Sequence, residues 1–139
     1  MTKKKSEKSV KKLVSKKTLT KPGNAQAMVL VQQVMHDFIV AKRAKTMESF
    51  FKTIAKVWQD ITTIEKLNTA FANVIADSAD WGFLETIEPT IIRDAITDRG
   101  DFMVVGAYST KPKKLIFEHI FVDEDGKWKL AEIKFFTAD

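Results

Sequence analysis

Four segments rich in β-branched and aromatic residues follow Pro89, and they constrain the fold of this chain more than any other feature. Short polar runs, "TDRGD", "STKPKK" and "DEDGK", separate these segments. Their composition and length suit the turns of β-hairpins. We therefore predict a four-stranded antiparallel meander with strands at residues 90–96, 102–108, 115–122 and 128–136. Gly106, inside the second of these strands, predicts a bulge or a sharp bend there.

The residues before Pro89 show helical spacing instead. Apolar side chains from Met28 to Ile39 predict a helix over residues 25–44, and a second apolar stripe, from Met47 to Trp58, predicts one over 47–59. Thr62 followed by Glu65 has the spacing of a capping box, which predicts a third helix ending near Asp77. A short helical turn should precede Pro89. Helices followed by strands are typical of an α+β domain, with the helices packed on one face of a curved sheet.

The positive charge of the chain is concentrated at its N-terminus. Nine lysines and one glutamate give residues 1–24 a formal charge of +8, so the remainder carries −3 of the total of +5. We predict that residues 1–24 form a disordered tail and that residues 25–139 form one domain. The tail has no aromatic residues for stacking on bases. It is a solvated extension or, alternatively, a weak contact for nucleic acid or an anionic membrane. The lysines proposed for that contact are Lys3, Lys4, Lys5, Lys11, Lys12, Lys16 and Lys17.

Several classes of function lack their residues in this sequence. There is no cysteine, and the two histidines are far apart in the chain, so we predict no metal site. We also expect no cofactor, because no glycine-rich phosphate loop is present. No apolar run approaches the roughly 20 residues that span a membrane. No apolar stretch follows the basic N-terminus, so we expect a cytoplasmic protein, or a periplasmic one only if a longer precursor exists.

The segment "LIFEHIFV" places Glu118 and His119 side by side in a predicted strand. With "DEDG" as the hairpin loop, Val122 lies opposite Lys127 and His119 lies opposite Leu130. Because side chains alternate along a strand, His119 then belongs to the helix-covered face and Glu118 to the opposite face, which we call the outer face. A one-residue bulge near Ala131 keeps the remaining apolar residues on the helix-covered face.

Two parts of the chain resemble a known family. "GAYSTKP" followed by "LIFEHIFVDEDGKWKLAEIKF" is similar to the C-terminal half of small uncharacterised bacterial domains with the nuclear-transport-factor-2-like fold, the cystatin-like α+β roll. "VWQDITTIEKLNTAF" resembles an earlier element of the same domains. The resemblance covers roughly residues 28–136. It implies the roll but no particular activity, because this superfamily hosts enzymes, carriers and assembly modules.

Three functions remain open from the sequence. The leading hypothesis is a non-enzymatic binding or assembly module, a homodimer formed through the outer-face residues Ile116, Glu118, Ile120 and Val122. The second is a pocket for a small apolar ligand, or an isomerase- or dehydratase-like enzyme. Its candidate pocket residues are His119, Tyr108, Trp58, Phe117 and Leu130, and none is assigned a catalytic role. The third is the anion-binding tail.

Overall fold

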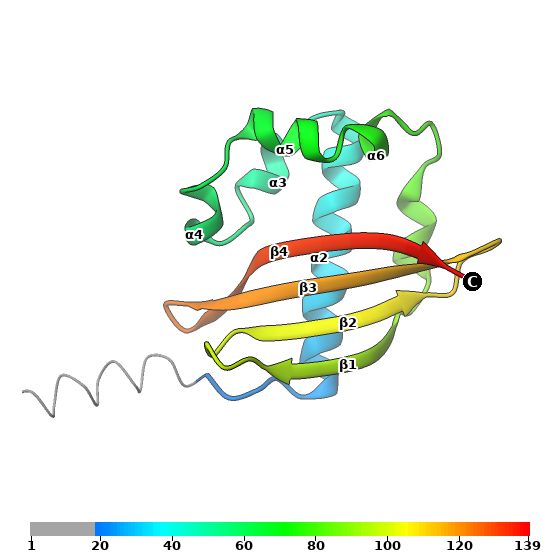
Figure 1. Ribbon diagram of the computed structural model, residues 1–139. Helices are drawn as coiled ribbons and strands as arrows, with labels where there is room; N and C mark the ends of the chain where they lie inside the picture. Colours follow the sequence, from blue (N-terminus) through cyan, green and yellow to red (C-terminus); the bar gives the residue numbers. More distant parts are fainter. Residues whose placement is uncertain (1–18) are drawn as a thin grey trace, which may run out of the picture.

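The computed structural model of the chain describes residues 19–139 (Figure 1). Helices come first and one four-stranded antiparallel sheet follows, which confirms the predicted α+β class. Within the described residues, no helix has both the length and the apolar character needed to cross a membrane. In chain order the elements are α2 (Asn24–Ala44), α3 (Glu48–Phe51), α4 (Lys56–Gln59), α5 (Ile64–Ala70), α6 (Ala72–Ala76), the 3-10 helix η1 (Trp81–Thr86), β1 (Thr90–Ile96), β2 (Phe102–Tyr108), β3 (Lys114–Glu124) and β4 (Lys127–Ala138).

The long helix α2 lies across one face of the sheet (Figure 1), as the spacing of its apolar residues predicts. Val31, Met35, Phe38 and Ile39 are buried on it and belong to the core. Phe38 is central to this packing, since its ring lies 5.1 Å from Phe135 of β4 and contacts three further aromatic rings. Burial of this stripe, more than helix propensity, holds α2 in place.

The prediction of one helix over residues 47–59 is wrong, because the chain breaks between α3 and α4. Ala55 is extended there, and its N–H donates to the carbonyl of Leu130 in β4 over 2.7 Å. The amide of Gln59 donates to the carbonyl of Phe51 over 2.8 Å, which satisfies one end of α3. These tertiary hydrogen bonds replace the ones that a continuous helix would have made.

The third predicted helix is also divided, and its cap lies one residue later than expected. The Thr63 hydroxyl, not that of Thr62, accepts from the N–H of Lys66 over 3.0 Å and begins α5. Phe71 then separates α5 from α6. The sequence offers two adjacent threonines, and Thr63 has the extended backbone of an N-cap (φ −138°, ψ 165°) as well as the capping hydrogen bond.

The strand order is β1-β2-β3-β4, so every strand pairs with its neighbour in the sequence. The bounds predicted for the first two strands are confirmed, and the last two strands are longer than predicted. The predicted four-residue loop is wrong: Glu124 pairs with Lys127, so only Asp125 and Gly126 form the turn. Both have positive φ (54° and 83°), as a type I′ turn requires.

This shorter turn shifts the predicted pairing of β3 with β4 by two residues. Val122 lies opposite Lys129 rather than Lys127, and His119, which lies beyond a one-residue bulge, is opposite Ile133 rather than Leu130. Because two is the period of a strand, the shift leaves every side chain on its predicted face. The predicted bulge is confirmed, with Ala131 as the extra residue between the pairs Ile120–Glu132 and Phe121–Leu130.

Gly106 lies beside an irregularity, but the bulge is in the neighbouring strand. The pairing of β1 with β2 shifts between Ile91 and Arg93, and Ile91 pairs with Gly106. A Cβ atom on Gly106 would lie 2.4 Å from the ring of Phe117 and 2.5 Å from the carbonyl oxygen of Thr90. Glycine is therefore needed here because the Phe117 ring covers this position.

Candidate functional site

The structure confirms the predicted faces of Glu118 and His119. His119 is 2% exposed on the helix-covered face, whereas Glu118 is half-buried on the outer face. Its carboxylate lies 3.9 Å from the ammonium group of Lys134, which stands directly opposite in β4. Glu118 is thus an ordinary cross-strand partner of a lysine.

The ring of His119 is enclosed by aromatic side chains. It stacks on Phe117 with a centroid separation of 4.8 Å and meets Phe121 and Phe135 edge-on. Its Nδ1 atom is buried without a hydrogen-bond partner among the described residues. Burial lowers the pKa of His119 to about 3, so the ring is neutral at physiological pH. The aromatic packing and the lowered pKa describe a core histidine more readily than an acid, a base or a ligand-binding group.

Tyr108 lines a separate pocket of about 250 Å³. It is 1% exposed, and burial raises the pKa of its hydroxyl to about 12, so it stays protonated and able to donate. Gln32 and Glu85 supply the polar wall of this pocket. The Glu85 carboxylate also meets Nδ1 of His36 at 2.5 Å, which joins η1 to α2.

The five predicted pocket residues do not share one cavity. Trp58 lines a groove on the outer face, Tyr108 lines the 250 Å³ pocket, and Leu130 lines a third cavity of about 340 Å³. His119 and Phe117 line none of these three. Phe117 contacts both His119 and Tyr108 (ring centroids 4.8 and 5.7 Å away), so an aromatic ring fills the space where a shared pocket was expected.

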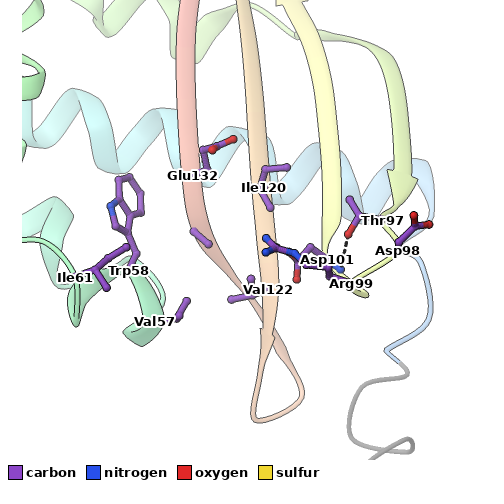
Figure 2. Close-up of a pocket in the computed structure, with 11 residues that line it drawn as sticks. Val57, Trp58, Ile61, Thr97, Asp98, Arg99, Asp101, Ile120, Val122 and Glu132 are labelled. Atoms are coloured by element: carbon purple, nitrogen blue, oxygen red, sulfur yellow. Dashed lines mark hydrogen bonds and ion pairs between the residues drawn. The ribbon is translucent and has the colours of Figure 1, made fainter.

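The largest of these hollows is the outer groove, about 730 Å³ in volume (Figure 2). Its floor is formed by Ile120 and Val122 of β3, both half-buried on the outer face. One wall comes from α4 and from Ile61, which lies just after it. The other wall comes from the β1–β2 turn. The residues lining it are Val57, Trp58, Ile61, Thr97, Asp98, Arg99, Asp101, Ile120, Val122, Ala131 and Glu132.

The two walls of the outer groove differ in chemistry. Val57 and Ile61 are 56% and 74% exposed, which is unusual for apolar side chains on one short segment. The opposite wall is polar and internally bonded: the N–H of Asp101 donates to the Thr97 hydroxyl over 3.1 Å, and Arg99 lies 3.4 Å from the Asp101 carboxylate. The groove therefore has one apolar wall and one charged wall.

Sequence reasoning predicted Trp58, Ile120 and Val122 but did not place them in one groove. Val57 was missed because it lies outside the apolar stripe of the predicted helix over residues 47–59, and Ile61 because it lies two residues beyond that helix. The visible signal was an apolar residue at a polar position of the helix, followed by another in the segment after it. Asp98 and Asp101 were treated only as turn residues.

Two further predictions concern ions. Within residues 19–139, no three histidine, aspartate or glutamate side chains are grouped closely enough to hold a metal ion. The lysines proposed for anion binding lie outside the described residues. Binding of nucleic acid or an anionic membrane by the tail therefore stays a prediction.

Comparison of the chain with protein-family models, with curated proteins and with solved structures finds no match. The case for a function therefore depends on the geometry of the chain's own residues.

Proposed function

We propose that the chain is a non-enzymatic assembly module that pairs with a second copy of itself through the outer face of the sheet. The observation that carries this proposal is the composition of that face, which α2 leaves uncovered and which α4 meets only at the groove (Figure 1). Phe136, opposite Ile116, is 51% exposed there. Apolar sheet faces of this kind are typical of contact surfaces. The half-buried apolar residues beside them are Met103, Val105, Ile120 and Val122.

A row of charges across the outer face supports pairing with a second copy. Arg93, Val105, Glu118 and Lys134 follow one another across the four strands. Among residues 19–139, Arg93 has no ion-pair partner, although it is exposed. A two-fold axis that passes beside Val105 and runs along the strands places Arg93 of each copy against Glu118 of the other. Opposite charges then meet twice in a self-complementary contact.

The fold family is part of the same proposal. We propose that the domain is a nuclear-transport-factor-2-like roll, on the resemblance of "GAYSTKP" and "WKL" to that family. A long helix crossing a four-stranded antiparallel meander is compatible with such a roll. The family hosts both enzymes and assembly modules, so it does not by itself select the function.

Sedimentation velocity of the full chain over a range of concentrations tests the pairing. Phe136→Glu should weaken the dimer, and Phe83→Glu is a matched control, because Phe83 is also 51% exposed but lies in η1, away from the outer face. Burying the exposed half of one Phe136 side chain removes about 100 Å² of apolar surface, worth about 2.5 kcal/mol per copy. The dimer Kd should therefore rise at least about 100-fold for Phe136→Glu alone. A monomeric parent chain at high micromolar concentration would refute the proposal.

The charge row has its own test. Arg93→Glu or Glu118→Arg should each weaken the dimer, and the double variant should regain at least part of the loss. Losses that simply add in the double variant would show that these two residues do not face each other across the dimer.

A small-molecule pocket is the second candidate, and one observation moves it away from His119. Tyr108, Glu85 and Gln32 line the same 250 Å³ pocket, whose polar residues could orient a ligand of a few heavy atoms. Screening small ligands by protein-detected NMR tests this candidate. Shifts confined to the Tyr108 and Glu85 surroundings, and lost in Tyr108→Phe, would support it. The absence of any such shift would remove it.

A further inference from the structure

The N-terminal segment enters the domain at the end of the sheet where the outer groove lies, on the helix-covered side of β1, because Asp94 stands opposite the buried Val104. Lys21 forms an ion pair of 2.9 Å with Asp94 of β1. Asp94 lies three residues before Thr97, where the polar wall of the groove begins. Figures 1 and 2 both show the chain that precedes α2 running next to the β1–β2 turn. The described chain therefore begins at the same end of the sheet as the groove, and 18 residues reach up to about 60 Å when extended, which is enough to pass around the β1 edge to the outer face.

The chemistry of residues 1–18 complements that of the groove. Eight lysines and one glutamate give the segment a formal charge of +7, while residues 19–139 carry −2. Three acidic residues, Asp98, Asp101 and Glu132, line the groove with one cation, Arg99. Asp101 already lies 3.4 Å from Arg99 and Glu132 3.9 Å from Lys134, so among residues 19–139 Asp98 is the groove carboxylate with no ion-pair partner. Three apolar residues interrupt the lysines of the segment, at positions i, i+3 and i+4, and one turn of helix would bring them to the same side. They are Val10, Leu13 and Val14.

We propose that residues 1–18 are the intramolecular ligand of the outer groove. Val10, Leu13 and Val14 cover the apolar floor and wall, and the neighbouring lysines meet the carboxylates at the polar rim. Because the segment is covalently attached to the domain, its effective concentration is high, and weak contacts are sufficient to keep it docked. A segment that binds in trans with a Kd of about 0.1 mM is about 90% docked when its effective concentration is about 1 mM.

Docking of this segment has a consequence for assembly. Ile120 and Val122 belong both to the groove and to the face through which we propose that two copies pair. The segment therefore competes with the second copy for the same residues. The docking itself does not rest on the proposed dimer; only this competition does.

Paramagnetic labelling of the full chain tests the docking directly. The chain has no cysteine, so Ser9→Cys gives a single site for a nitroxide label next to Val10. We expect strong broadening of the Trp58 indole and of the Ile120 and Val122 methyl resonances, and little effect on the helix-covered face. Raising the salt concentration to 1 M should reduce the broadening, because the charge contacts are exposed.

Two comparisons make the result decisive. Adding V10S/L13S/V14S to the labelled chain should abolish the broadening, whereas the control pair Thr2→Ala and Ser6→Ala should keep it. Mixing labelled chains with unlabelled isotope-enriched chains separates the two sources of a docked segment, since broadening in the mixture would place it on another copy. Broadening in the mixture, broadening that persists in V10S/L13S/V14S, or no broadening at the groove would each overturn the proposal. The sedimentation of Phe136→Glu reports on the dimer separately.

Discussion

The buried imidazole of His119 makes the stability of this protein sensitive to acid. The ring is 2% exposed among aromatic side chains, and its pKa is lowered from 6.5 to about 3 by burial. In the unfolded chain the imidazole is therefore protonated as the pH falls below about 6.5, whereas in the folded chain it stays neutral until the pH approaches 3. The stability that comes from the neutral ring is complete above pH 6.5 and is lost as the pH falls from there toward 3.

The magnitude follows from the two pKa values. Between pH 7 and pH 5 this single group should cost about 2 kcal/mol of unfolding free energy, since each pH unit below 6.5 costs about 1.4 kcal/mol. His119→Phe keeps an aromatic ring in the stack and removes the titrating group. At pH 7 the free energy of unfolding of the variant should rise by about 1–3 kcal/mol, because an unpaired buried nitrogen is removed. Overpacking by the larger phenylalanine ring offsets part of this gain. The pH dependence is thus the diagnostic quantity, and not the stability at one pH.

Urea unfolding followed by tryptophan fluorescence measures this quantity. Parent and His119→Phe should be compared at pH 7 and pH 5, and the difference of their losses isolates His119, because all other titrating groups are shared. We expect the parent to lose about 2 kcal/mol more than the variant. Equal losses in the two proteins would show that His119 is hydrogen-bonded or solvated in the folded state, against the burial described above.

Two further substitutions test the fold. Gly106→Ala should destabilise the protein by about 2–3 kcal/mol in the same urea assay, because the new Cβ atom meets the Phe117 ring at 2.4 Å; a change below 0.5 kcal/mol would mean that the strands adjust freely. Thr63→Ala should cost about 1 kcal/mol through loss of its hydrogen bond to the N–H of Lys66, whereas Thr62→Ala should cost almost nothing. The opposite order of the two threonines would restore Thr62 as the cap.

The strands were predictable from the sequence because two local signals agree there. Alternating apolar residues set the strands, and the turn residues between them set the ends. The face of His119 was also predictable, because the shorter turn shifts the pairing by two residues, one full period of a strand, and the bulge was itself predicted. The exact pairing was not, because "DEDG" is compatible with a four-residue loop as well as with the Asp125–Gly126 turn.

The helices were less predictable because tertiary contacts override their local pattern. Nothing near Ala55 in the sequence indicates that its N–H will pair with Leu130, about 75 residues later. The outer groove was not predictable for the same reason, because it depends on tertiary contacts. The outer groove joins Val57 to Asp98 and Val122, and only the packed fold brings these three segments together.

The hydrogen bond from Ala55 to Leu130 also affects how the sheet meets other chains. An open sheet has two edge strands, and unpaired edges invite strand addition and aggregation. Here the β4 edge is occupied at Leu130, bulged at Ala131, and lined by Lys127, Lys129 and Lys134. The β1 edge is interrupted by its own bulge at Ile92. Both edges are thus poor templates for a growing sheet, so self-association is directed away from fibre-like stacking of strands and toward a closed, face-to-face pair.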